Sequence, residues 1–354
     1  MEIFETLEET WQRQDSILSN FENIGPRGLE YYPSNEFYGI DLIVKKLLGM
    51  DSSQRLKIAL PHGAEIGDWG PANNFFGNLD LSTLVYTNDI GLENLIKNRV
   101  PGFRIRAEHP FLLLLHLMQE RGLLTKNLRP GTLFYPAHRD YYYKFTNRDY
   151  DEILVGELVN RVNDVGQIYV SLPLIDIKLG RHEVYERRGF QVVSCGSRYD
   201  PKFLTRFINL ANSFTNLATS EIGSHLFYGA ALGIPFDIWS SKLGRLQNAQ
   251  SLGSKVKIEG RLHPSVADQL FRQERISEDY ARHILGYTEF REDNDLVSSW
   301  ELIHRKAIYR DKFAVWVPKG KFRTSKIPSS TKRFLKSFKA ARKLNKQLKS
   351  LFVC

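Results

Sequence analysis

Hydrophobic and polar positions follow a strand, loop and helix order along this chain. A short apolar strand predicted over residues 57–60 runs into a polar, glycine-rich loop, PHGAEIGDWG (61–70). LSTLVYTND (81–89) predicts a second strand and a helix that begins at Asp89 or Gly91. FRIRAEHPFLLLLHLMQERG (103–122) predicts a third strand, a loop at His109 and Pro110, and an apolar helix. This order is typical of parallel α/β layers.

The same order begins again near residue 130. Strands followed by loops are predicted in GTLFYPAHRD, GQIYVSLPLIDIKLG, FQVVSCGSRYD, TNLATSE and IPFDIW, with a helix between each strand and the next. Residues 245–318 are predicted to be mostly helical. We therefore predict an α/β fold of two Rossmann-like domains facing across a cleft, with a helical C-terminal extension. The predicted domains are residues 1–130, residues 131–318 and a tail, 319–354.

Composition restricts the class of protein. The chain has 354 residues, of which 42% are hydrophobic and 25% charged, as in soluble globular proteins. Its start is acidic and polar, unlike a signal peptide, and its apolar runs are shorter than the roughly 20 residues that a membrane span needs. Two cysteines suggest neither a metal site nor a disulfide framework. We expect a cytoplasmic protein.

The positive charge is concentrated in the tail. The net charge is +9, but residues 319–354 hold twelve Lys or Arg and no acid, which leaves −3 for residues 1–318. This distribution argues against a nucleic-acid-binding body. Apolar residues at spacings of three and four predict an amphipathic helix, and cations near an anionic bilayer contribute about 1 kcal/mol each. We predict peripheral attachment to the inner membrane face; a solvated helix packed on the body and an RNA-binding tail are the alternatives.

The stretch TSEIGSHLFYGAALGIP (219–235) predicts a polar helix start. Thr219 or Ser220 can cap the helix, and Gly223 allows a ligand to approach the backbone. Exposed N–H groups and the helix dipole suit a diphosphate, while Glu221 can accept hydrogen bonds from ribose hydroxyls. The alternative is that Ser220 and Glu221 only cap an apolar helix.

Two other loops carry candidate chemistry. His62, Glu65 and Asp68 lie among glycines after the first strand, and one of them could deprotonate an acceptor hydroxyl. In YPAHRD, an imidazole and a guanidinium follow a strand, where they could bind phosphate oxygens. The alternatives are a glycine-rich turn with solvated acids and an ordinary surface loop.

These motifs resemble those of GT-B glycosyltransferases, in particular bacterial capsule and surface-polysaccharide transferases related to CDP-glycerol glycerophosphotransferases and Kdo transferases. FYPAHRD is similar to the segment that opens the C-terminal domain of that group, and TSEIGSHLFYGAALGIP is similar to its donor-binding segment. The resemblance implies that residues 1–130 form an acceptor domain and residues 131–318 a donor domain. It assigns donor binding to Pro136, His138, Arg139, Ser220, Glu221, Gly223 and Ser224, and we add the adjacent His225. The acceptor-side loop would contain His62 and Gly63.

We therefore expect a metal-independent glycosyltransferase that moves a sugar from a nucleotide-sugar donor to a surface-polysaccharide or lipid-linked acceptor. No cofactor is expected besides the donor substrate, and no nucleic-acid partner. Metal independence is what the resemblance implies, because the helix dipole and basic side chains neutralise the leaving diphosphate in GT-B enzymes. Two rivals remain: a nucleotide-sugar epimerase of the same two-domain plan, and a non-catalytic module that binds membranes or RNA.

Overall fold

The computed structural model describes most of the first 303 residues. The described residues are 2–22, 24–67, 83–97, 100, 103–137, 148–239, 262–273, 275–287 and 300–303. The predicted tail, residues 319–354, lies outside them. No helix in the described part is long and apolar enough to span a membrane.

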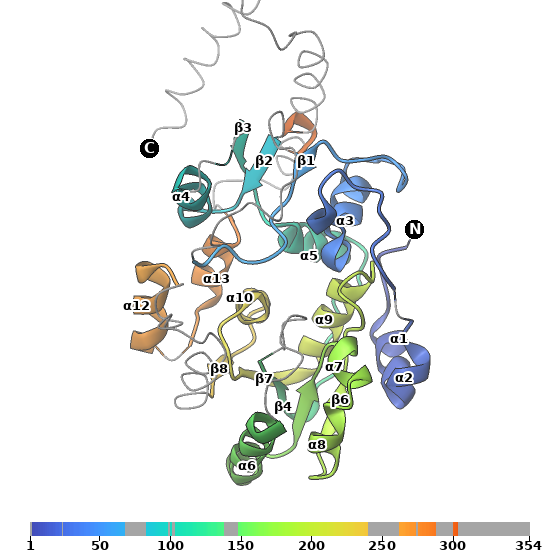
Figure 1. Cartoon of the computed structure of the whole chain (residues 1–354), viewed down its shortest axis with the longest axis vertical. Helices are drawn as coiled ribbons and strands as arrows, with labels where there is room; N and C mark the ends of the chain where they lie inside the picture. Colours follow the sequence, from blue (N-terminus) through green and yellow to red (C-terminus); the bar gives the residue numbers. More distant parts are fainter. Residues whose placement is uncertain are drawn as a thin grey trace, which may run out of the picture. The chain divides into compact units, whose positions relative to one another are not determined.

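The first group of elements contains a three-stranded parallel sheet in the order β1-β2-β3 (Figure 1). Its strands are β1 (Ile58–Ala59), β2 (Thr83–Tyr86) and β3 (Phe103–Arg106), and its helices are α3 (Ile40–Leu47), α4 (Asp89–Lys97) and α5 (Pro110–Glu120). Before them come α1 (Leu7–Gln12), η1 (Arg13–Ser16), α2 (Ile17–Asn20) and the 3-10 segment η2 (Pro33–Gly39). Helix α5 is apolar on nearly every side, and it is correspondingly buried from Pro110 to Leu115.

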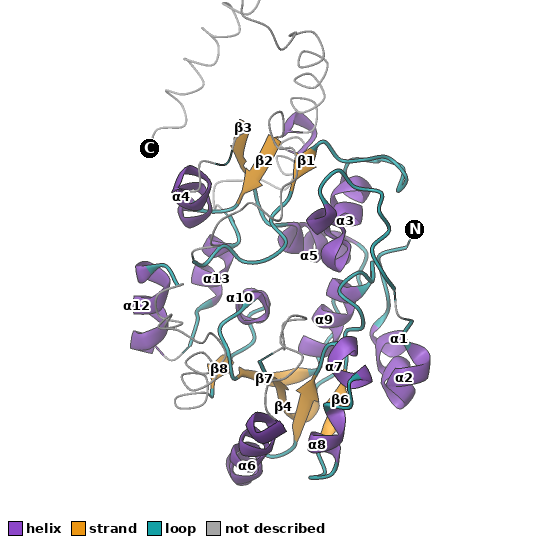
Figure 2. Cartoon of the chain, viewed as in Figure 1, coloured by secondary structure: helices purple, strands orange, loops and turns teal. Residues whose placement is uncertain are grey.

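The second group contains a parallel sheet in the order β6-β5-β4-β7-β8. Its strands are β4 (Arg129–Tyr135), β5 (Ile168–Ser171), β6 (Gln191–Val193), β7 (Phe214–Thr219) and β8 (Phe236–Ile238). The helices are α6 (Arg148–Val165), α7 (Leu174–Lys178), α8 (His182–Glu186), α9 (Phe203–Ala211), α10 (Ser224–Ala231), α12 (Pro264–Gln273) and α13 (Glu278–Ile284). In Figure 2 the strands form two separate sets with helices around each.

The prediction of an α/β fold with two parallel sheets is confirmed. The central strands are apolar and buried on both faces, as parallel sheets require: Leu133, Phe134 and Val170 are all fully buried. One hydrophobic cluster reaches from Ile58 and Phe111 in the first group to Phe236 in the second, so both sheets contribute to a common core. The exact domain boundaries stay a prediction.

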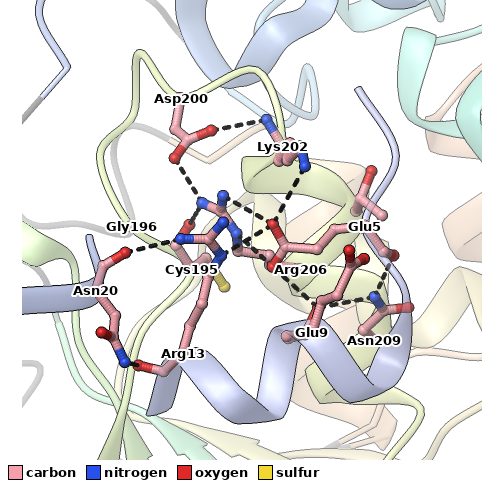
Figure 3. Close-up of polar contacts among 12 residues, drawn as sticks. Glu5, Glu9, Arg13, Asn20, Cys195, Gly196, Asp200, Lys202, Arg206 and Asn209 are labelled. Carbon is pink, nitrogen blue, oxygen red and sulfur yellow. Dashed lines mark hydrogen bonds and ion pairs between the residues drawn. The ribbon is translucent and has the colours of Figure 1, made fainter. Parts of the chain in front are cut away.

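The amino-terminal helices pack on helices of the second group, α1 on α9 and α2 on α7. Figure 3 shows the contact that anchors them: the Arg206 guanidinium on α9 lies between the carboxylates of Glu5 and Asp200. Glu5 accepts from Arg206 Nε at 2.9 Å, and Asp200 accepts from Arg206 Nη1 at 2.6 Å. Burial by itself would lower the pKa of Arg206, but these carboxylates raise it, so the guanidinium stays charged.

A second buried ion cluster, in the second group, consists of one arginine and two aspartates. Arg181 donates to both carboxylate oxygens of Asp151 at 3.0 Å from Nε, and to Asp176 at 2.6 Å. These two aspartates therefore serve as structural partners of one guanidinium. Cys195 is buried, and burial raises the pKa of its thiol to about 12.

Candidate functional site

The predicted site residues follow the carboxyl ends of strands in both sheets. The chain runs from β4 outward to β5 and β6, and then returns to β7 on the other side of β4. The gap between β4 and β7 is therefore a topological switch point, where ligands bind in open α/β sheets. The loops that leave β4 and β7 carry the predicted donor residues.

Hydroxyl groups join the ends of β4 and β7. Ser220 Oγ accepts a hydrogen bond from the Ala137 amide at 2.8 Å, and Thr219 Oγ1 lies 2.9 Å from the Tyr135 carbonyl oxygen. Thr219 and Ser220 are fully buried. Pro136, between Tyr135 and Ala137, is buried as well. These residues hold the two loops in place, a positioning role that the sequence did not reveal.

Helix α10 begins at Ser224, later than its sequence suggested. Its N-cap is Gly223, in extended conformation, and no side chain caps the helix. The expectation that Thr219 or Ser220 caps it is wrong, because β7 continues through Thr219 and the chain then needs residues 220–223 to turn. The positive end of the helix is consequently left without a side-chain cap, next to the half-buried residues Glu221 and Ser224.

His225 fixes the conformation of the same turn. Its Nε2 lies 2.8 Å from Thr219 Oγ1, and its ring stacks on Tyr135 with centroids 5.3 Å apart. A Cβ atom on Gly223 would lie 2.9 Å from Cε1 of this ring. A side chain at position 223 would therefore require the His225 ring to move.

The end of β1 and the loop of residues 61–67 that follows it are attached to four other segments. Asn35 bridges the end of β1, since its Nδ2 donates to the Ile58 carbonyl at 2.8 Å and its Oδ1 accepts from the Leu60 amide at 2.9 Å. The His263 amide donates to the Ile66 carbonyl at 3.0 Å, and the Glu65 side chain, described below, is bound to the start of α4. The fourth attachment is to Ser224, at the start of α10.

The loop of residues 61–67 and the start of α10 contact each other directly. The Ala64 amide donates to Ser224 Oγ at 3.0 Å. A Cβ atom on Gly63 would lie 2.5 Å from the same oxygen, so this glycine permits the contact. Two motifs 160 residues apart in the sequence, each predicted separately, thus form one region of the structure.

His62 is the exposed member of the acceptor-side loop. Its side chain is open to solvent, yet the surrounding protein desolvates it, and together with the charge of Arg198 this lowers its pKa to about 4. The Phe37 ring meets it edge to face at 5.4 Å. At neutral pH the imidazole is therefore uncharged and able to accept a proton.

Glu65 is buried and faces the start of α4. Its Oε2 accepts hydrogen bonds from the Thr87 amide at 2.5 Å and from Thr87 Oγ1 at 2.8 Å. No residue in the described part of the chain hydrogen-bonds its Oε1. Burial raises the pKa of Glu65 to about 7, although the bonds from Thr87 oppose the shift. This carboxyl supports the β2–α4 junction.

A buried histidine and tyrosine that the sequence did not single out join the two groups of elements. The hydroxyl oxygen of Tyr228, on α10, lies 3.3 Å from His109 Nε2. Since His109 Nδ1 accepts from the Phe111 amide at 3.0 Å, the proton of the neutral ring is on Nε2. Burial, with His62 nearby, lowers the pKa of His109 to about 3. The only sequence signal was the His-Pro pair before the apolar helix.

Three predicted site residues, Asp68, His138 and Arg139, lie outside the described residues. Within the described ranges, no group of three or more His, Cys, Asp or Glu side chains is arranged to hold a metal ion. A hollow of about 680 Å³ lies elsewhere, at the amino ends of β4 and β6, where Trp11, Arg129 and Gln191 line it.

Comparison with known proteins gives weak likenesses of fold. No protein-family model and no curated protein matches the sequence. Among solved structures, the wall teichoic acid polymerase TagF is 14% identical with a TM-score of 0.35, over 74% of this chain and 70% of that one. UDP-GlcNAc 2-epimerase from Neisseria meningitidis, bound to UDP-GlcNAc, is 11% identical with a TM-score of 0.36, over 87% of this chain and 84% of that one.

A UDP-glucose: anthocyanidin 3-O-glucosyltransferase in complex with UDP is 10% identical, with a TM-score of 0.26, over 78% of this chain and 63% of that one.

Proposed function

We propose that this chain is a metal-independent glycosyltransferase, which moves a sugar from a nucleotide-sugar donor to a surface-polysaccharide or lipid-linked acceptor. The observation that carries the proposal is the contact between two loops that leave different parallel sheets, the Ala64 amide and Ser224 Oγ being 3.0 Å apart. A transferase needs one substrate on each side of such a junction, so that the acceptor hydroxyl can reach the sugar.

The donor binds at the switch point between β4 and β7 in this proposal. Glu221 accepts hydrogen bonds from the ribose, and Gly223, Ser224 and His225 surround the phosphate at the start of α10. Because Ser224 Oγ is bonded to Ala64, a donor phosphate that binds there replaces this partner. Pro136 belongs to the same side, and His138 and Arg139 remain candidates for the phosphate.

The acceptor reacts beside His62. Of the two candidate bases that the structure describes, His62 is exposed, whereas Glu65 is buried against Thr87. The neutral imidazole takes the proton of the acceptor hydroxyl, while the oxygen of that hydroxyl forms a bond to the sugar carbon. The bond from that carbon to the donor phosphate breaks, and the helix dipole of α10 stabilises the departing nucleotide. Asp68 remains the other candidate.

The tail places the enzyme at its acceptor. Residues 319–354 contain twelve cationic side chains and no acid, which suits the anionic cytoplasmic face of a membrane. A lipid-linked acceptor would be presented at that surface.

The test is nucleotide release from nucleotide-sugars with and without a membrane lipid extract as acceptor source. We expect release that requires the extract, and a 10²- to 10⁴-fold loss, roughly, in His62→Ala, the range for a removed general base. His283→Ala, an exposed histidine on α13, is the control and should retain activity. Conversion of the donor to an epimer without acceptor would indicate the epimerase, and neither binding nor turnover would indicate the non-catalytic module.

A further inference from the structure

A rigid loop after β6 carries an arginine, Arg198, that the motifs did not indicate. Arg206 Nη1 donates to the Cys195 carbonyl at 3.2 Å and to Asp200 at 2.6 Å, so both ends of the loop are bonded to one buried guanidinium (Figure 3). Between them, the Ser197 hydroxyl donates to the Ile24 carbonyl at 2.8 Å. The loop is thus supported by buried polar groups rather than only by its own turns.

The segment of residues 37–39 also packs against this loop. The Tyr38 amide donates to the Arg198 carbonyl at 2.5 Å. Tyr38 has φ of 60°, a left-handed conformation that is unusual for a bulky residue. Such conformations persist where the surroundings enforce them, often at functional sites.

The Arg198 side chain is held by aromatic rings rather than by an acid. Its Cζ lies 4.9 Å from the centre of the Phe37 ring and 5.1 Å from that of Tyr199. The residue is exposed, and among the described residues no carboxylate forms an ion pair with it. Arg181 and Arg206, by contrast, are buried between two carboxylates each. A guanidinium held on aromatic faces keeps its N–H fork available for an oxyanion.

Arg198 lies beside His62. Phe37 contacts both, edge to face with the imidazole at 5.4 Å, and the Arg198 charge helps to lower the pKa of His62. Strand β6 is at the edge of its sheet, two strands from β4, so its loop is displaced from the switch point where the donor is expected. The loop of Arg198 thus leaves the sheet two strands from the switch point, and Phe37 connects its guanidinium to the imidazole of His62.

We propose that Arg198 binds a phosphate group of the acceptor and thereby positions the acceptor hydroxyl at His62. This inference rests on the proposed function, because it uses the same site. It adds that the acceptor is anionic next to its reactive hydroxyl. Arg offers two parallel hydrogen bonds to phosphate, which fix orientation as well as charge.

The experiment titrates inorganic phosphate into the full chain and follows the Cε1–H proton signal of His62 by NMR, assigned from its loss in His62→Ala. Phosphate should bind and raise the pKa of His62, because a nearby anion stabilises the imidazolium. Arg198→Gln should weaken phosphate binding about tenfold or more and should raise the pKa of His62 in the absence of phosphate. Arg198→Lys should restore the charge effect on His62 but only part of the affinity.

Arg187→Gln is the matched control, an exposed arginine of the second group whose ion-pair partner among the described residues is Glu152. It should bind phosphate as the wild type does. Thermal melting should first show that the wild type and Arg198→Gln are both folded. Equal phosphate affinity of the two proteins would then overturn the inference. A pKa of His62 that is the same in both would overturn it as well.

A repeat of the titration at saturating CMP, CDP, UDP, GDP or dTDP separates the two sources of phosphate. Undiminished phosphate binding assigns Arg198 to the acceptor, whereas competition assigns it to the donor and overturns the acceptor assignment. If none of these nucleotides binds, the proposed function fails. The phosphate affinities of the wild type and Arg198→Gln still show whether Arg198 binds phosphate.

Discussion

His62 and Glu65 are three residues apart and have opposite protonation behaviour. The exposed imidazole has a pKa of about 4 and is neutral at pH 7, whereas the buried carboxyl has a pKa of about 7 and is partly protonated there. Desolvation causes both shifts, because it disfavours the charged form of each group. Exposure distinguishes a group that can meet a substrate from one that supports the fold.

Glu65 makes stability depend on pH. The folded protein holds this proton more tightly than the unfolded chain, whose carboxyl has the ordinary pKa of 4.5. Its contribution to stability is therefore complete below pH 4.5, decreases as the pH rises to about 7, and is lost above that, a change of roughly 3 kcal/mol. We expect urea denaturation at pH 5 and pH 8 to show this loss in the wild type and not in Glu65→Gln.

Glu186→Gln, at an exposed position on α8, serves as the control for that measurement and should keep the wild-type pH dependence. A wild-type profile identical to that of Glu65→Gln would show that the carboxyl is not held as described.

Of the residues proposed for the site, those that the sequence indicated belong to a motif. Ser224, Gly223 and His62 lie in glycine-punctuated stretches, and the structure brings these stretches together. Arg198 was missed because SCGSRYD is an ordinary polar loop in the sequence. Its significance depends on Phe37, which lies far away along the chain and contacts it only in the folded protein.

Contact between the η2 segment and the loop after β6 requires a glycine. Gly39 has φ of +72°, and a Cβ atom there would lie 2.5 Å from the Pro201 carbonyl oxygen. Gly28 has a similar φ of +65° but nothing within 4 Å of its Cβ position. The two glycines thus differ in packing and share a backbone conformation.

We therefore expect Gly39→Ala to destabilise the protein more than Gly28→Ala in urea denaturation. Each substitution lowers the free energy of unfolding by about 1 kcal/mol, because alanine is unfavourable in a left-handed conformation. Gly39→Ala adds an overlap with backbone that cannot rotate away, worth roughly 1–3 kcal/mol. Equal free energies of unfolding for the two variants would contradict the close approach of Gly39 to Pro201.

The order of strands and long helices was predictable because each has its own hydrophobic period. Helix α7 was expected to be a loop, since its five residues, Leu174–Lys178, are too few to show a helical repeat. The docking of α1 on α9 was not predictable either. It depends on the Glu5–Arg206 pair, whose members are 201 residues apart, and neither residue stands out locally.

At the scale of the whole molecule, the tail gives the membrane hypothesis a direct test. We expect the full chain to sediment with vesicles of anionic phospholipid at low salt and to be released at high salt, because screening weakens exposed charge interactions. Replacing Lys336, Lys339, Arg342 and Lys343 by Gln should reduce binding markedly, at about 1 kcal/mol for each cation. Unchanged binding by this variant would contradict a role for the tail charge.

The two sheets share a hydrophobic core and a hydrogen bond between their candidate loops, so the proposed donor and acceptor sides form one unit. The central claim is that this unit binds a nucleotide at the start of α10. The most direct test is thermal unfolding of the purified chain with CMP, CDP, UDP, GDP and dTDP, repeated with Glu221→Ala and with the exposed control Glu186→Ala.

We predict that one nucleotide stabilises the protein, by about 2.7 kcal/mol at a hundredfold excess over its dissociation constant. The stabilisation should weaken in Glu221→Ala and persist in Glu186→Ala. Absence of stabilisation by every nucleotide, or equal stabilisation of the wild type and Glu221→Ala, would contradict the proposed donor site.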